Sequence, residues 1–216
     1  MITEKFVFWD WNGTLLNDTG VCITAMNKML AKRQMPELDK HKYLRIFGFP
    51  VKNYYEKLGF DFHNESFEEL SVEFIAQYNN QIASIPLMQE ASHLLNYFYN
   101  EGRENIIVSA MQQEMLEKTV SQHGLNRYFK AILGIDNIYA QSKTDLALEY
   151  VKRVSIDTCD AILIGDTLHD HEVAKEIGCR CILVASGHQS EERLKQTGRQ
   201  VVRTLSDLLD TIERNN

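Results

Sequence analysis

Three polar residues each close a short apolar run, and a lysine opens a helical pattern ahead of the last of them. They are Asp10, Ser109, Asp166 and Lys143. If the runs are parallel strands, their carboxyl ends meet at one edge of a sheet, which brings these side chains together. Two neighbouring carboxylates repel each other and need a cation between them. Mg²⁺ fits, because one or two carboxylates plus substrate phosphate typically hold it. Lys143, Ser109 and the backbone amides around Gly13 could then bind the remaining phosphate oxygens.

Five short apolar runs predict buried strands, because each has the length of a strand and is bounded by polar or turn residues. Amphipathic stripes between them predict helices. Strands that alternate with helices imply an α/β fold, in which helices cover both faces of a parallel sheet. The predicted strands are residues 6–9, 106–108, 131–133, 161–164 and 181–184, and the helical stripes are residues 91–98, 115–120, 146–151 and 173–177.

Residues from about 18 to 86 break this alternation and contain no convincing strand. Ser66 and Glu69 have the spacing of a capping box, which begins a helix. We therefore predict a helical cap over residues 18–86, inserted into an α/β core of residues 1–17 and 87–216. Helices in the cap are expected near residues 21–31, 38–45, 51–58 and 66–84.

The composition is that of an ordinary globular protein, with 44% hydrophobic and 25% charged residues among 216. The formal net charge of -7 argues against nucleic acid or an anionic membrane as the main partner. No apolar run approaches the roughly 20 residues of a membrane span. Cys179 and Cys181 share one face of a predicted strand, which favours buried thiols over a disulfide. We expect a cytoplasmic protein, with monomer and homodimer both left open.

Four segments together resemble the motifs of the haloacid dehalogenase superfamily. Residues 10–14, Asp-Trp-Asn-Gly-Thr, are similar to its first motif, Asp-x-Asp-Gly-Thr, and residues 106–109 to its second, a strand that ends in Ser or Thr. Lys143 matches the third motif, and residues 165–170 match the fourth, Gly-Asp-x-x-x-Asp. A helical cap straight after the first motif is similar to the phosphoglycolate phosphatase and β-phosphoglucomutase branch. The resemblance covers the whole chain and implies a three-layer, Rossmann-like core.

The resemblance also implies an activity: magnesium-dependent hydrolysis of a small phosphorylated metabolite. Asp10 would attack phosphorus and become an aspartyl phosphate, which water later hydrolyses. Ser109, Ala110, Gly13 and Lys143 would hold the transferring phosphoryl group, and Lys143 would also restrain Asp10.

The same resemblance implies a metal site and a contact from the cap. Mg²⁺ would be held by the carboxylates of Asp10 and Asp166 and by the backbone carbonyl of Asn12. Asp170 would bind a water of the metal or orient its neighbours. In the cap, Arg45 lies near where relatives place a substrate-reading loop, so we expect it to contact the substrate.

Asn12 departs from the family pattern, because family phosphatases carry a second Asp at this position as general acid and base. An amide cannot carry a proton, and acid–base help is commonly worth about 10²–10⁴-fold. Three explanations stay open. In the first, the substrate has a good leaving group, as an acyl phosphate or anhydride does. In the second, another group, such as His169, His171 or a cap residue, replaces the missing acid and base. In the third, phosphorylated Asp10 is long-lived. A protein that binds or senses phosphate ligands with little turnover is the alternative function.

Overall fold

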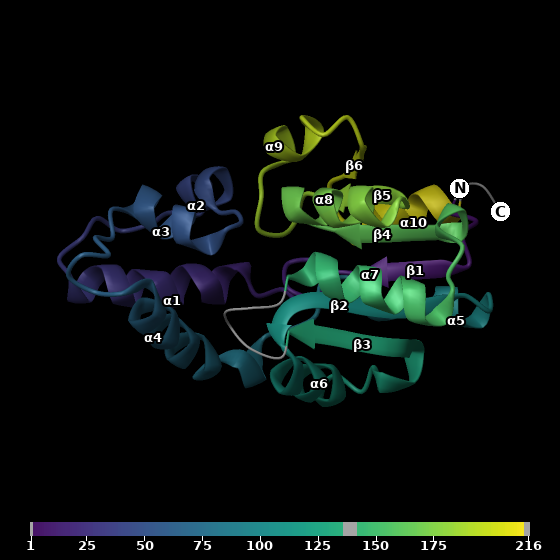
Figure 1. Cartoon of the computed structure of the whole chain (residues 1–216), viewed down its shortest axis with the longest axis horizontal. Coiled ribbons are helices and arrows are strands. Elements are labelled where there is room, and N and C mark those ends of the chain that lie inside the picture. The colour runs from purple at the N-terminus through teal and green to yellow at the C-terminus, as the bar shows by residue number, and fades with distance from the viewer. Residues whose placement is uncertain (1, 136–141, 214–216) are drawn as a thin grey trace.

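A six-stranded, all-parallel sheet forms the centre of the computed structural model, which describes residues 2–135 and 142–213 (Figure 1). The strand order is β3-β2-β1-β4-β5-β6, so β1 lies between β2 and β4. This order places the carboxyl ends of β1 and β4 side by side. The strands are β1 (Phe6–Trp9), β2 (Glu104–Gln112), β3 (Phe129–Ile135), β4 (Ala161–Gly165), β5 (Arg180–Val184) and β6 (Gln200–Val202).

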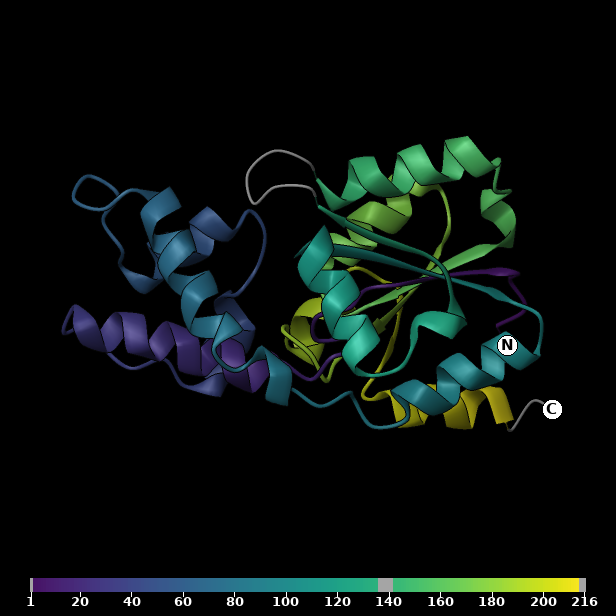
Figure 2. The same cartoon turned by 90° about the horizontal axis from the view of Figure 1, so that it is seen from below.

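Helices cover both faces of the sheet, as expected for an α/β fold. Successive strand residues point to opposite faces, so Trp9 packs in the cluster that contains α5, α6 and α10, whereas Phe8 packs in the cluster that contains α7 and α8. Figure 2 shows α7 on one side of the sheet and α5 and α10 on the other. The core helices are α5 (Ala91–Asn100), α6 (Gln113–Gln122), α7 (Lys143–Val154), α8 (Leu168–Ile177), α9 (Glu191–Lys195) and α10 (Leu205–Glu213).

The first four of the helices between β1 and β2 lie together, beyond one end of the sheet (Figures 1 and 2). The predicted capping box is present at the start of α4, where the side chains of Ser66 and Glu69 each bond the other residue's backbone N–H. The helix predicted over residues 66–84 ends earlier, at Asn79, and a separate 3-10 turn follows, since asparagine is a weak helix former. The cap elements are α1 (Thr19–Lys32), α2 (Lys40–Ile46), α3 (Val51–Leu58), α4 (Phe67–Asn79) and the 3-10 turn Ile82–Ser84.

Two adjacent segments carry the chain into these helices and back. Leu16 pairs with Leu87 in an antiparallel bridge, and the backbone N–H of Asn17 donates to the carbonyl of Pro86 at 2.9 Å. From these contacts we propose that residues 18–86 form the cap and that the rest of the chain forms the core.

Two details of the core differ from the sequence-based expectation. Strand β2 does not stop before Ser109 but continues to Gln112, with an irregular pairing to β3 after Val108 that the apolar pattern could not indicate. Strand β6 was missed because it has three residues, none of them fully buried, at the edge of the sheet.

Candidate active site

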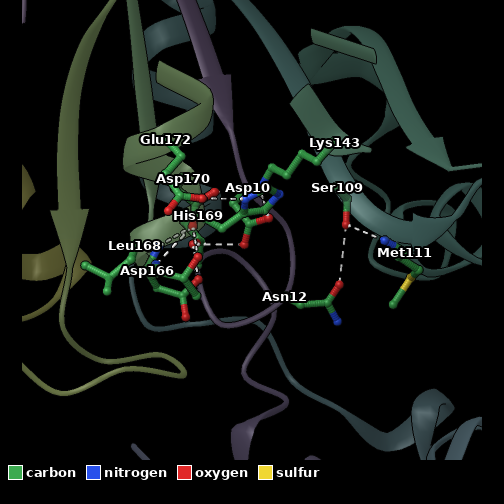
Figure 3. Close-up of polar contacts among 12 residues, drawn as sticks. Asp10, Asn12, Ser109, Met111, Lys143, Asp166, Leu168, His169, Asp170 and Glu172 are labelled. Atoms are coloured by element: carbon green, nitrogen blue, oxygen red, sulfur yellow. Dashed lines mark hydrogen bonds and ion pairs between the residues drawn. The ribbon is translucent and has the colours of Figure 1, made fainter. Parts of the chain in front are cut away.

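A buried lysine joins two carboxylates at the carboxyl edge of the sheet. Asp10 follows β1, and its backbone N–H donates to the carbonyl of Ile164 in the neighbouring strand β4 at 2.9 Å. Lys143, the first residue of α7, donates from Nζ to Oδ1 of Asp10 and, at 2.6 Å, to Oδ1 of Asp170 (Figure 3). Lys143 is 3% exposed and Asp170 1%. The order of strands has thus brought together residues that lie 133 positions apart.

A third carboxylate, that of Asp166, completes the cluster. Its Oδ1 accepts from the Thr14 hydroxyl at 3.0 Å, and its Oδ2 accepts from the backbone N–H of His188 at 2.6 Å. Carboxylate oxygens of Asp10, Asp166 and Asp170 all lie within 4.8 Å of one another. Three buried carboxylates at this spacing form a hard, oxygen-only donor set, which is the kind that Mg²⁺ prefers.

Asp170 is held from two directions. Its Oδ2 accepts from the backbone N–H and the hydroxyl of Thr167, at 3.0 and 2.8 Å, and so forms the capping box of α8. Its Oδ1 contacts Lys143. The start of a helix therefore fixes Asp170, and Asp170 in turn fixes the ammonium group of Lys143 against Asp10.

The pKa values report how the charges compensate each other. Burial, together with the nearby Asp170 and Asp166, raises the pKa of Asp10 well above its ordinary value, although Lys143 opposes this. Burial also raises the pKa of Asp166, to about 6. For Asp170 the ion pair with Lys143 outweighs burial and lowers the pKa. Burial is the main cause of both raised values, and a divalent cation bound among these carboxylates would favour their charged forms.

Gly13 allows the loop after β1 to pack directly on this cluster. Its φ of +77° lies in the left-handed region, and an added Cβ would lie 2.4 Å from Oδ2 of Asp166. Only glycine fits both the backbone conformation and the space, so the loop and its amides stay close to the carboxylates.

Asn12 is fixed by groups of the cap. Its Nδ2 donates to Oδ2 of Asp18 at 2.7 Å and to the hydroxyl of Tyr78 at 3.0 Å. Its Oδ1 is directed at Ser109, whose hydroxyl donates to it at 3.4 Å (Figure 3). The amide is thus oriented by its donor end, and no proton on it can be given up to a substrate.

A buried network next to Asn12 was not found by sequence reasoning. Oδ1 of Asp18 lies 3.1 Å from Nε2 of His188, and the hydroxyl of Tyr43 lies 2.8 Å from Nδ1 of the same ring. Burial alone would lower the pKa of His188, but Asp18 raises it to about 9, so the imidazole is protonated at neutral pH. Asp18 precedes helix α1, which predicts a capping residue, yet its side chain makes no capping hydrogen bond.

A cleft of about 350 Å³ lies above these groups and is lined from both the cap and the core. Asp10, Asn12, Ser109, Ala110 and Lys143 line it. The structure does not bring every expected residue to this cleft.

Of the two histidines weighed as replacement acids, His169 lines the cleft and lies 3.3 Å from Glu172. His171 does not line the cleft and instead bonds Arg199. The expectation for Arg45 is not supported, because its side chain is exposed near the end of α2 and is not part of the wall.

Known hydrolases resemble this chain along most of its length. Residues 7–184 match the family model of the haloacid dehalogenase-like hydrolases. Phosphoglycolate phosphatase 1 of Pseudomonas aeruginosa is 24% identical over 213 residues, which cover 95% of this chain and 78% of that protein. The phosphoglycolate phosphatase of Aquifex aeolicus is 23% identical over 186 residues, 85% of this chain and 86% of that one.

The fold is shared with solved structures. A haloacid dehalogenase-like family hydrolase from Streptococcus pneumoniae superimposes with a TM-score of 0.82 at 18% identity, over 98% of this chain and all (100%) of that chain.

None of the helices that the structure describes is long and apolar enough to cross a membrane. Because the family model matches residues 7–184, which include Asp10, Asp166 and Asp170, the chain belongs to the haloacid dehalogenase-like hydrolases, in their phosphoglycolate phosphatase-like branch of phosphoric monoester hydrolases.

Proposed function

We propose that this phosphatase uses Asp10 as a nucleophile toward a small phosphorylated metabolite, with Mg²⁺ as its cofactor and the cytoplasm as its location. The observation that carries the proposal is the position of Asp10 at the floor of the cleft, next to Lys143. One oxygen of Asp10 is bound by Lys143. Among residues 2–135 and 142–213, the other oxygen accepts only from the Thr14 hydroxyl, at 3.3 Å, which is long for a bond between oxygens. That second oxygen is available to attack phosphorus.

The reaction then has two steps that balance. In the first, Asp10 forms a bond to phosphorus, the bond from phosphorus to the leaving oxygen breaks, and this oxygen departs with the electron pair. In the second, water attacks the phosphorus of the aspartyl phosphate. The carboxylate of Asp10 is released, and both hydrogens of the water leave with inorganic phosphate.

Lys143 and Ser109 hold the phosphoryl oxygens during both steps. Burial would lower the pKa of Lys143, but Asp10 and Asp170 raise it above the ordinary value, so it stays a cation throughout. Asp170 acts on the reaction by holding Lys143 in place.

The donor set fits a magnesium ion bound by Asp10, Asp166 and the main chain of Asn12. When bound, the ion would supply neutralisation of the charge on the phosphoryl oxygens. Burial raises the pKa of Asp166 to about 6, and a bound cation would favour its charged form.

Asn12 limits the first step for alkyl esters, because no carboxylic acid protonates the leaving oxygen. Asp18 is no substitute, since its ion pair with His188 outweighs burial and lowers its pKa, which leaves it a carboxylate. We therefore propose that the substrate has a leaving group that departs without a proton.

The test is phosphate release from a panel of small phosphate esters and acyl phosphates, with Mg²⁺ present, compared with the Asp10→Ala variant. Release that depends on both Asp10 and Mg²⁺ supports the proposal. Equal release by the variant would refute it.

The second candidate is a phosphate-binding or sensing protein, which the fixed amide of Asn12 favours. Mass spectrometry of the intact protein after mixing with acetyl phosphate separates the two. A phosphoryl adduct on Asp10 that persists for hours supports sensing, and free phosphate without an adduct supports turnover.

A further inference from the structure

The wall of the cleft away from Lys143 is apolar and aromatic. Phe47 and Phe49 follow α2, Tyr54 lies on α3 and Phe74 on α4, and the core adds Met115 from α6. The ring of Phe47 contacts those of Phe49 and Tyr54, and the centroids of Phe47 and Tyr54 are 5.3 Å apart in an edge-to-face arrangement. The cleft volume of about 350 Å³ is at the small end of ligand sites, large enough for one ring beside a phosphate.

The charged groups of the cleft are gathered at its phosphoryl end, and its cations are already paired. Lys143 contacts Asp10 and Asp170, and His188 contacts Asp18. Within residues 2–135 and 142–213, the wall includes no arginine and no second lysine. A leaving group with its own carboxylate or second phosphate would therefore enter an apolar wall without a free counter-charge, which is costly.

Polar side chains such as Asn79 and Gln112 also line the cleft, but two of its tyrosine hydroxyls are already bonded within the protein and are less available to a sugar or polyol. The hydroxyl of Tyr43 is bonded to His188, and that of Tyr78 to Asp18 and Asn12. The hydroxyl of Tyr54 is buried and has no hydrogen-bond partner among the described residues. Together with the aromatic side chains, this favours a leaving group that is largely apolar.

Asn12 restricts the leaving group independently of the wall. Without a general acid, the leaving oxygen departs as an anion. An alkoxide is about as basic as hydroxide, whose conjugate acid, water, has a pKa of about 15.7, whereas a phenol such as tyrosine has a pKa of about 10. A phenolate therefore leaves far more easily than an alkoxide when no proton is supplied.

We infer that the substrate is a small aryl phosphate, the phosphate monoester of a phenol. The inference rests on the proposed phosphatase function and names its substrate class. The aromatic wall and the amide of Asn12 each favour it. An acyl phosphate satisfies only the second condition, and an apolar alkyl phosphate only the first.

Binding tests the wall without any turnover. In calorimetric titrations with Mg²⁺, phenylphosphonate is compared with methylphosphonate, and neither can be hydrolysed. Burial of the ring should make phenylphosphonate bind about 10- to 100-fold more tightly, with a negative heat-capacity change. Phe74→Ala should reduce this ratio several-fold, whereas the control Phe62→Ala, in the same cap but outside the cleft wall, should leave it unchanged. Equal affinities for the two phosphonates in the wild type overturn the inference.

Turnover tests the leaving group. Phenyl phosphate should exceed methyl phosphate in kcat/KM by about 10²-fold or more, and acetyl phosphate should show a KM at least tenfold above that of phenyl phosphate. Turnover of acetyl phosphate with the lower KM overturns the aryl assignment and leaves the phosphatase proposal intact. Selective binding of phenylphosphonate without Asp10-dependent hydrolysis of any ester supports the wall and refutes the proposed function.

Discussion

The contact between Asn12 and Asp18 makes a substitution at this pair unusually informative. In the wild type the amide of Asn12 donates to a carboxylate oxygen of Asp18 at 2.7 Å, and Asp18 is 1% exposed. Asn12→Asp restores the residue of the family motif, but it also places a second carboxylate against a buried one.

The magnitude follows from the distance. Two unit charges 2.7 Å apart repel by about 6 kcal/mol at an effective dielectric constant of about 20. Protonating one of the two carboxylates requires less free energy than this repulsion. For a carboxyl group with a pKa of about 3.9, protonation at pH 7 requires roughly 4 kcal/mol. The variant should therefore fold with one proton shared by the pair, at a cost in unfolding free energy of up to about 4 kcal/mol at pH 7.

The sign of the pH dependence is fixed by this proton. In the folded variant, the pair of carboxyl groups binds its shared proton with a pKa above the value of about 3.9 in the unfolded chain. The stabilisation from this proton is therefore fully present below about pH 4. It is lost as pH rises toward the folded pKa, by about 1.4 kcal/mol per pH unit. The difference in unfolding free energy between variant and wild type should thus grow from pH 4.5 to 7.

Urea denaturation over this pH range, with the metal chelated, measures the difference. The control is Asn12→Asp combined with Asp18→Asn, which exchanges donor and acceptor, read in a double-mutant cycle with Asp18→Asn alone. A difference that stays constant from pH 4.5 to 7 would show that the two side chains do not face each other.

The same variant, Asn12→Asp, tests whether the absence of a general acid at position 12 limits the reaction. A proton held between residues 12 and 18 should raise the turnover of alkyl phosphates, with about 10²-fold as the lower end of acid–base help. If Asn12→Asp folds and gains nothing on methyl phosphate, the loss of an acid at this position does not limit the reaction.

Three further predictions concern other parts of the molecule. Lys143→Met should lower kcat/KM for any substrate by at least about 10²-fold. Because the substitution leaves two buried carboxylates uncompensated, it should also reduce the unfolding free energy by about 3 kcal/mol, measured by denaturation in the presence of a chelator. Unchanged stability would contradict the ion pairs of Lys143. Removal of Mg²⁺ should abolish turnover, and its return at 100 times its Kd should raise the unfolding free energy by about 2.7 kcal/mol; no change in Tm on adding Mg²⁺ would argue against the metal site. In the cap, Glu73→Gln breaks a 2.7 Å ion pair with Arg33 and should cost up to about 1 kcal/mol at pH 7. Hydrogen bonding to Arg33 lowers the pKa of Glu73 from 4.5, so this difference should hold above pH 4.5 and disappear as pH falls through the lower folded value; a difference that persists at the acid end would be inconsistent with the ion pair.

Local residue patterns were enough to predict the architecture and which residues meet at the floor of the site. Short apolar runs and amphipathic stripes are local signals, and five of the six strands carry them. Because parallel strands end at one edge, the positions of Asp10, Asp166 and Lys143 along the chain were enough to predict that they meet. The capping box of Ser66 and Glu69 was equally local, with its partners three residues apart.

The surroundings of Asn12 and the lining of the cleft could not be predicted in this way, because they depend on contacts between distant segments. Asp18 and His188 are 170 positions apart, and no periodicity in either segment indicates that their side chains meet. The same holds for Tyr78, which reaches Asn12 from the far end of α4, and for Arg45, whose position beside the substrate loop suggested a contact but whose side chain points to solvent. Side-chain direction and long-range packing depend on how cap and core fit together, which local residue patterns do not encode.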